Sequence, residues 1–256
     1  INDWTQRSAI SANALMLIAG EHDIRFDYYQ AVGSAVVKLE WAGPVMRAVI
    51  PSTQLLPGEV ATEQFGAWKG RTFNTPKLGA QVYSTSNDAI TVYSAGLDLS
   101  GLTDGHHLVW QPMEGSFHFE AKIYQLINTN AFSTKALLMA RNTLATGSPL
   151  IAPARMATGQ LGCKGRLAAG NNIADMLSPA WQYTPANPFW MLLTRRGNTF
   201  TAAFKNASTN AWTTFYTFVD TNQVFTSSMI VGLSVTSPNA PSNAPFPNAT
   251  FSDIRL

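Results

Sequence analysis

The chain has 256 residues, and its 17 Lys and Arg against 15 Asp and Glu give a formal net charge of +2. Charged residues make up 12% and aromatic residues 11% of the composition, which excludes a disordered or collagen-like chain. This net charge is too small and too scattered to supply the basic surface that nucleic acid needs. We therefore expect no nucleic-acid partner. Apolar stretches fall short of the roughly 18 residues of a membrane span, so we expect no membrane insertion.

The single cysteine, Cys163, excludes an internal disulfide framework and a zinc site built on cysteines. We expect its thiol to be buried or idle. The chain opens at Ile1 with neither an initiator Met nor a charged and then apolar leader, so we expect a processed or partial product.

Hydrophobic periodicity predicts an all-β chain. Apolar residues at helical spacing are nearly absent, whereas many short runs alternate or are rich in β-branched and aromatic residues. A hairpin is expected within residues 24–41. Later strands are expected at residues 89–93, 107–110, 116–124, 136–141, 189–195, 199–204, 213–219, 229–236 and 249–256. The irregular stretch 149–188 predicts long loops.

The Pro57-Gly58 pair marks a break, so we expect two domains, residues 1–57 and residues 58–256. The strand intervals of the second domain are typical of an antiparallel two-sheet sandwich. Alternation along 116–124 predicts that one set of side chains faces its core, namely Phe117, Phe119, Ala121 and Ile123. Three tryptophans inside predicted strands are also expected in the core: Trp41, Trp110 and Trp190.

Residues 1–5, 18–25, 27–29, 37–41 and 50–55 resemble the closing half of the protective-antigen-type β-sandwich module. Such modules occur in secreted adhesins, toxins and glycosidases and often bind glycans, so the resemblance implies an extracellular or cell-surface location. Their calcium-and-sugar site uses an acidic pair in the earlier half, which this sequence does not contain. We therefore expect no cofactor, and calcium dependence is left open because no ligand set for it is found in this chain.

A second resemblance covers nearly all of the remaining chain. Residues 106–112, 115–122, 136–141, 190–200, 231–237 and 249–254 look like a concanavalin A-like jelly roll of the laminin-G-like kind found in bacterial secreted proteins. The resemblance implies a jelly-roll domain over residues 58–256. It leaves the ligand open, because the superfamily includes sugar binders, protein binders and catalytically silent spacers.

Catalytic residues are not recognisable in the sequence. A glycosidase needs two carboxylates about 5 to 10 Å apart, and the three closely spaced acids of the catalytic glucanases of this superfamily are not found. Glu114 and Glu120 could share a strand face, but a solvated face explains them as well. His106 and His107 are adjacent on a strand and point to opposite faces, which disfavours a metal site. We expect a protein that is not an enzyme.

Candidate ligand-binding residues are those whose chemistry suits sugars. Sugar sites on β-sandwiches combine an aromatic plane with polar hydrogen-bonding groups. Aromatic residues in predicted loops meet the first need, namely Trp68, Trp181 and Tyr183. His118 and Glu120 share a strand face that suits either a polar ligand or solvent. Arg141 ends an apolar strand, where it either binds a ligand or anchors a loop through carbonyl groups.

Two functions follow from these features. The first is a non-catalytic, lectin-like module for carbohydrate binding or adhesion in a larger secreted or surface protein, with a glycan or polysaccharide as partner. The alternative is a self-associating structural subunit of an extracellular filament or surface layer. Low charge, a hydrophobic fraction of 46% and strands rich in Thr, Asn and Ala suit close packing between copies. A glycosidase is the third interpretation.

Overall fold

The computed structural model describes residues 40–41, 48–49, 67–73, 79–85, 88–94, 98–124, 126–127, 134–177, 179–206, 211–238 and 247–256. The chain divides into two compact units, Ile1–Ala61 and Thr62–Leu256. In the first unit, β1 (Glu40–Trp41) pairs antiparallel with β2 (Ala48–Val49). The rest of the hairpin expected within residues 24–41, the packing of Trp41 and the module expected over residues 1–57 lie outside the described residues.

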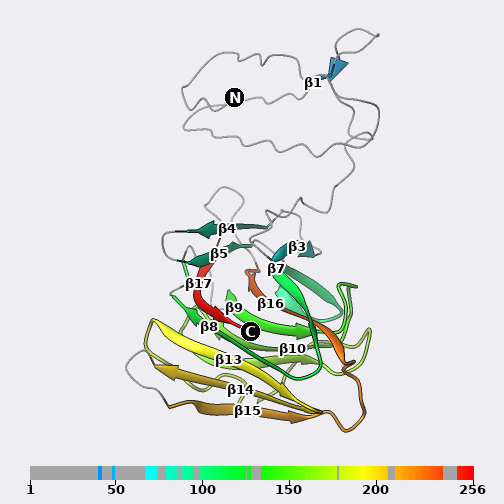
Figure 1. The fold of residues 1–256 in the computed structure, drawn as a ribbon, viewed down its shortest axis with the longest axis vertical. Helices are drawn as coiled ribbons and strands as arrows, with labels where there is room; N and C mark the ends of the chain where they lie inside the picture. Colours follow the sequence, from blue (N-terminus) through cyan, green and yellow to red (C-terminus); the bar gives the residue numbers. More distant parts are fainter. Residues whose placement is uncertain are drawn as a thin grey trace. The chain divides into compact units, whose positions relative to one another are not determined.

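The second unit is an antiparallel jelly-roll sandwich of two sheets (Figure 1). One sheet has eight strands in the order β12-β11-β10-β9-β16-β7-β3, with β6 paired to β7, and the other has seven in the order β15-β14-β13-β8-β17-β5-β4. Its strands are β3 (Lys69–Phe73), β4 (Ala80–Ser84), β5 (Ala89–Tyr93), β6 (Asp98–Ser100), β7 (Thr103–Glu114), β8 (Phe117–Ile123), β9 (Lys135–Arg141), β10 (Leu150–Met156), β11 (Leu161–Arg166), β12 (Ala174–Asp175), β13 (Phe189–Arg196), β14 (Thr199–Asn206), β15 (Thr213–Val219), β16 (Ser228–Thr236) and β17 (Asn248–Arg255).

The predicted fold class is confirmed, because the described residues form strands and turns and contain no helix. Among these residues there is therefore no helix long and apolar enough to cross a membrane. The predicted strands at residues 189–195 and 199–204 form a hairpin, since β13 and β14 pair directly across Gly197, which takes a φ of 57°. That conformation favours glycine, which has no Cβ.

The core between the two sheets is assembled by strand alternation. In β8 the four side chains predicted to face inward are buried, and Phe119 has no exposed surface. Phe119 lies opposite Leu193 of β13, which is buried in the same cluster. The prediction of the two faces of β8 is therefore confirmed. Other members of this cluster come from both sheets and include Val109, Leu138, Val231, Phe200 and Phe251.

The stretch 149–188 contains β10 and β11, so the expectation of long loops there is wrong for these segments. β10 lies between β9 and β11, and its first six residues are all buried. A strand buried on both faces shows no alternation, and alternation is the sequence pattern that predicts a half-buried strand. Pro153 also argued against a strand here, because proline is rare in central strands. The ladder to β9 has no register pair at Pro153: the pairs on either side are Ile151 with Ala140 and Ala154 with Leu137.

The outer face of the eight-stranded sheet is covered. A second apolar cluster lies there, and its members Leu108, Leu137 and Met139 have no exposed surface. The β6–β7 hairpin reaches the segment between β11 and β12, since Gly101 forms an isolated bridge with Ile173. Its buried Asp104 forms ion pairs of 2.9 Å with Arg141 and 2.7 Å with Arg166.

Candidate functional site

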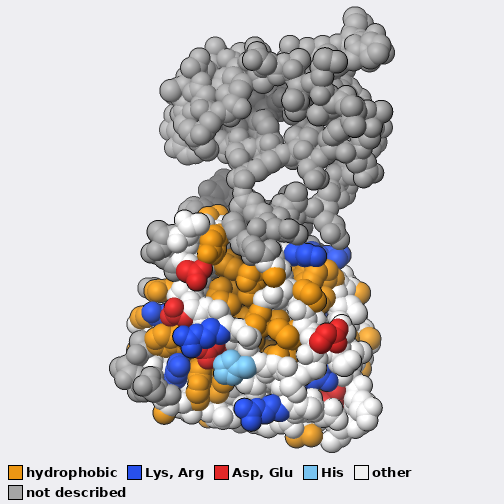
Figure 2. Space-filling model, in the orientation of Figure 1, with side chains coloured by type: hydrophobic (Ala, Val, Ile, Leu, Met, Phe, Trp, Pro, Cys, Tyr) orange, Lys and Arg blue, Asp and Glu red, His pale blue; other side chains and the backbone are white. Residues whose placement is uncertain are grey.

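The outer face of the seven-stranded sheet carries polar and aromatic side chains. Strand alternation turns them away from the core that Phe119, Met191 and Phe200 help to form. They are His118, Glu120 and Lys122 of β8, Trp190, Leu192, Thr194 and Arg196 of β13, and Thr199, Thr201 and Lys205 of β14. On the face of the unit drawn in Figure 2, hydrophobic side chains lie beside basic, acidic and histidine side chains.

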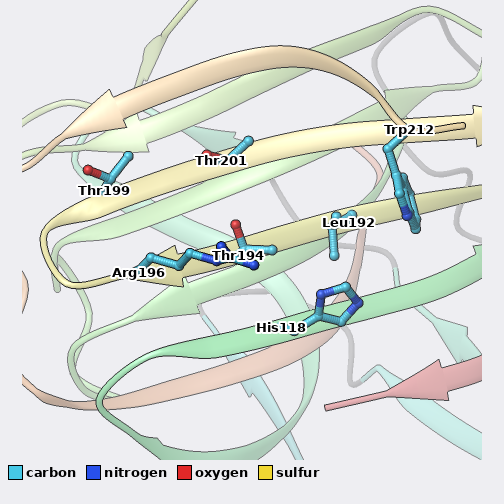
Figure 3. Close-up of a pocket in the computed structure, with 7 residues that line it drawn as sticks. All are labelled: His118, Leu192, Thr194, Arg196, Thr199, Thr201 and Trp212. Carbon is cyan, nitrogen blue, oxygen red and sulfur yellow. The ribbon is translucent and has the colours of Figure 1, made fainter.

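A shallow depression of about 380 Å³ lies on this face. Its lining residues come from β8, β13, β14 and the residue before β15, and they are His118, Leu192, Thr194, Arg196, Thr199, Thr201 and Trp212. In Figure 3, Leu192 lies between the Trp212 indole and the His118 imidazole, while Arg196 and Thr199 lie at the other end. The depression therefore combines apolar surface with hydroxyl, imidazole and guanidinium groups.

Lysines and aromatic rings alternate across the same face. The Lys122 ammonium lies 4.9 Å from the ring centroid of Trp190 and 5.4 Å from that of Tyr124. The Lys205 ammonium lies 4.5 Å from the ring of Trp212 and 5.4 Å from that of Trp190. Each contact is within the range of a cation–π interaction. We call the five side chains, Tyr124, Lys122, Trp190, Lys205 and Trp212, the cation–aromatic row.

The expectation that Trp190 belongs to the core is wrong. Its neighbours in β13, Phe189 and Met191, face the core, so alternation turns Trp190 outward, where it is half-buried. In the two ladders it lies opposite Lys122 and Lys205, which explains why both ammonium groups reach its ring. Trp110, also expected in the core, is half-buried against the second apolar cluster.

His118 and Glu120 lie on one face of β8, as alternation predicts, and they bind each other. The His118 Nε2 is 2.8 Å from the Glu120 carboxylate, and the Arg255 Nη1 is 3.3 Å from its other oxygen. The Glu120 side chain is 6% exposed, whereas that of His118 is 51% exposed. Glu120 is thus held by two basic groups, and His118 keeps an accessible edge toward the depression. A direct ligand-binding role for either residue stays a prediction.

The three aromatic residues proposed from predicted loops pack against the protein itself. Trp181 lies directly on Gly162, where an added Cβ would be 2.6 Å from the ring. The Tyr183 ring is 5.5 Å from that of Phe204, and the Trp68 ring is 6.1 Å from that of Phe119. None of the three lines the depression. Their ligand-binding roles stay predictions, but they do not form one site with His118 and Glu120.

Arg141 has the geometry of the loop-anchoring alternative. Its Nε donates to the Thr143 carbonyl at 2.7 Å, and its Nη2 donates to the Ala145 carbonyl at 2.8 Å. The same Nη2 donates to the Asp104 carboxylate at 2.9 Å, and the side chain has no exposed surface. Burial lowers the pKa of Arg141, while the neighbouring Asp104 opposes this shift.

The adjacent histidines are both buried. The Nδ1 of His107 lies 2.8 Å from the Thr72 hydroxyl, and its Nε2 lies 2.6 Å from the Gln81 side-chain oxygen. His106 stacks on Phe73 with ring centroids 4.7 Å apart. Burial lowers the pKa of His107 to about 4 and that of His106 well below its ordinary range. In the part of the chain that the structure describes, no three His, Cys, Asp or Glu residues gather as metal ligands would.

Sequence reasoning missed most of the depression, because the lining residues are brought together by strand register. One signal was available. Trp212 directly precedes the strand predicted at residues 213–219, so it is an aromatic residue at a strand end and meets the criterion that selected Trp181. The threonines Thr194, Thr199 and Thr201 gave no comparable signal, since threonine is common in ordinary strands.

No protein-family model matches the chain, and no curated protein matches it either. A functionally unknown protein from Saccharomyces cerevisiae is similar in structure, with a TM-score of 0.52 and 14% identity over 73% of this chain and 94% of that one. This likeness supports the sandwich fold. A β-glucanase from Bacillus licheniformis has a TM-score of 0.44 at 10% identity, covering 73% of this chain and 90% of its own. Lectin II from Ulex europaeus has a TM-score of 0.41 at 14% identity, covering 75% and 99%.

Proposed function

We propose that the second unit is a non-catalytic carbohydrate-binding module whose ligand lies on the outer face of the seven-stranded sheet. The depression that Trp212, Leu192 and His118 line is the observation that carries this proposal. An indole presents an apolar plane to the C–H face of a sugar ring, and hydroxyl and imidazole groups bond to its hydroxyls. Thr194 and Thr201 supply such hydroxyls on the two neighbouring strands.

The shape of the site favours a polysaccharide chain over a single sugar. The lining spans β8, β13, β14 and the start of β15, and neighbouring strands lie about 4.8 Å apart. Four strands therefore cover about 14 Å, which accommodates more than one sugar ring. The cation–aromatic row continues the polar and aromatic surface beyond Trp212 toward Tyr124.

The chemistry of the lining supports binding without hydrolysis. Glycoside hydrolysis requires a pair of carboxyl groups about 5 to 9.5 Å apart across the scissile bond. None of the seven lining side chains is acidic. Glu120 lies on the same face, but His118 and Arg255 already engage its two oxygens.

We extend the proposal to the whole protein as a module of a larger secreted or cell-surface protein that adheres to glycans. The sequence resemblance of residues 58–256 to bacterial secreted jelly-roll domains supports this part. Calcium plays no part in the proposed mode of binding, which uses side chains of this chain alone.

The test is binding of soluble polysaccharides to the purified chain, measured by affinity electrophoresis and calorimetry. Trp212→Ala should weaken binding by about tenfold or more, since tryptophan side chains in binding sites often dominate affinity. Trp181→Ala is the matched control, because it removes the same kind of side chain from a position packed against Gly162 of β11, in the other sheet. Each variant must first show a cooperative unfolding transition. Loss of binding in Trp181→Ala with full binding in Trp212→Ala would refute the assignment.

Self-association is the second candidate function, and the edge strand β15 favours it. Among the described strands only β14 pairs with β15, so one edge of β15 ends the sheet. Its sequence from Thr213 to Val219 contains no charged residue and no proline, the residues that commonly protect sheet edges, and Val219 is 52% exposed. A second copy could extend the sheet by pairing there. Light scattering should then give a mass above one chain that Thr217→Lys reduces, and a monomer at every concentration would exclude it.

A further inference from the structure

The outer face of the seven-stranded sheet holds more basic than acidic side chains. Four basic residues lie on it, namely Lys122, Arg196, Lys205 and Arg255, against two acids, Glu120 and Asp253. Both acids are paired on the face itself. Arg255 lies 3.3 Å from Glu120, and Lys122 lies 3.9 Å from Asp253. Two positive charges are therefore left without a carboxylate partner among the described residues, those of Arg196 and Lys205.

The two uncompensated charges flank the depression. Arg196 is exposed and lines one end of it, beside Thr194 and Thr199. Lys205 lies at the other end, where its ammonium is 4.5 Å from the ring centroid of Trp212. A ligand seated between Trp212 and Arg196 would thus have a cation at each end. The hydroxyls of a neutral polysaccharide can accept hydrogen bonds from these groups, but such a polymer has no negative charge to neutralise either cation.

The cation–aromatic row holds its ammonium groups in place. Lys122 and Lys205 approach Trp190 from β8 and β14, the two strands on either side of it. A lysine held against an aromatic ring gives up less rotamer freedom when it binds an anion, so its charge is partly prearranged. Both lysines contact the Trp190 ring, whereas of the two only Lys205 contacts that of Trp212, so Trp212 is the less occupied plane for a sugar and Trp190 supports the lysines.

We propose that the ligand of this site is an acidic polysaccharide, whose carboxylate or sulfate groups bind Arg196 and Lys205 while a sugar ring packs on Trp212. The inference rests on the proposed function and names its substrate class. The planar guanidinium of Arg196 offers two parallel N–H donors to such a group, and the Lys205 ammonium acts as a point charge. Anionic groups repeating along a chain would meet both ends of the depression.

The experiment compares binding of polygalacturonate, a sulfated dextran and unmodified dextran to the full chain, by calorimetry at low and high salt. We expect at least one acidic polymer to bind about tenfold or more tightly than neutral dextran at low salt. Its affinity should fall as salt rises from about 0.05 M to about 0.5 M, because salt screens exposed charges. Comparing polygalacturonate with sulfated dextran tells carboxylate from sulfate recognition.

Charge-removing variants locate the effect. Arg196→Gln and Lys205→Gln should each weaken acidic-polymer binding by about fivefold and flatten its salt dependence. Lys164→Gln is the matched control, because that lysine pairs with Asp175 on the other sheet, at 2.7 Å. An unchanged affinity in both test variants, or an equal loss in the control, would overturn the inference.

Failure of the inference and failure of the proposed function give different results. Equal binding of neutral and acidic polymers, abolished by Trp212→Ala, would overturn the charge-based inference and leave carbohydrate binding standing. Binding of none of these or of a broader panel of polysaccharides would overturn both. A short single-stranded DNA that binds as tightly as the acidic polymers would also overturn the inference, since the face would then attract any polyanion.

Discussion

Stability should decline steeply as the pH falls below about 6.5, and the buried His107 is one reason whose size can be worked out. Its ring is buried, and as the neutral Nε2–H tautomer it accepts from the Thr72 hydroxyl and donates to Gln81. Thr72 also accepts from the Gly79 backbone at 3.0 Å. Because Thr72 belongs to β3 and Gln81 to β4, this chain of bonds joins the edge strands of the two sheets. A protonated ring has no acceptor nitrogen for Thr72.

The magnitude follows from the pKa shift. Burial lowers the pKa of His107 from 6.5 to about 4 in the folded protein. Between these values the unfolded chain binds a proton that the folded chain does not, so the free energy of unfolding falls as the pH falls. The contribution is complete above pH 6.5, is lost progressively down to about pH 4 and then stays constant. At 1.36 kcal/mol per pH unit the loss is about 3 kcal/mol between pH 7 and pH 4. The lowered pKa of His106 acts in the same direction.

Urea unfolding from pH 7.5 to pH 4, followed by tryptophan fluorescence, measures this effect. His107→Gln keeps hydrogen-bonding groups but does not titrate, so its decline over this range should be smaller than that of the native chain by about 3 kcal/mol. His118→Gln is the control, since its side chain is 51% exposed. Parallel profiles for the native chain and His107→Gln would refute the reasoning. If His107→Gln does not fold, an NMR titration of the His107 ring in the native chain gives the same answer: a pKa near 6.5 is the refuting value.

Three further substitutions test packing through urea unfolding at neutral pH. Phe119→Ala should cost about 3 to 5 kcal/mol, because the ring has no exposed surface, and a cost below about 1 kcal/mol would mean that the faces of β8 are misassigned. Asp104→Asn should cost about 3 to 5 kcal/mol by leaving two buried guanidinium groups without a carboxylate. Asp175→Asn should cost about 1 kcal/mol or less, because Asp175 is exposed. Gly162→Ala should cost about 1 to 3 kcal/mol, because its Cβ would lie 2.6 Å from Trp181 and 2.7 Å from a backbone oxygen; an unchanged stability would contradict that packing.

The sequence predicted most strongly the elements that have one apolar face. β8 alternates between apolar and polar residues, so both its position and the inward direction of Phe119 were predictable. β10 was not, because burial on both faces removes the alternation and Pro153 argues against a central strand. The same alternation could have placed Trp190 correctly, since Phe189 and Met191 fix the opposite phase. A residue that lies in a strand can face either side of the sheet, and only the alternation of its neighbours shows which side it faces.

The candidate site was less predictable than the fold. His118 and Glu120 were found because two residues on one strand reveal a shared face. The depression also needs Thr194 from β13 and Thr201 from β14, and only the register of two ladders brings these together. Loop position did not indicate that the Trp181 ring packs on a glycine of β11. Sequence spacing does not report such packing between strands.

The separation between the two faces of the seven-stranded sheet makes its outer side suitable for protein engineering. Thr194, Thr199 and Thr201 contribute nothing to the apolar core, and surface positions of this kind usually tolerate exchange at a cost within about 0.5 kcal/mol. A library randomised at these three positions would therefore vary the recognition surface on an unchanged scaffold. New specificities could be selected from it without first restoring stability.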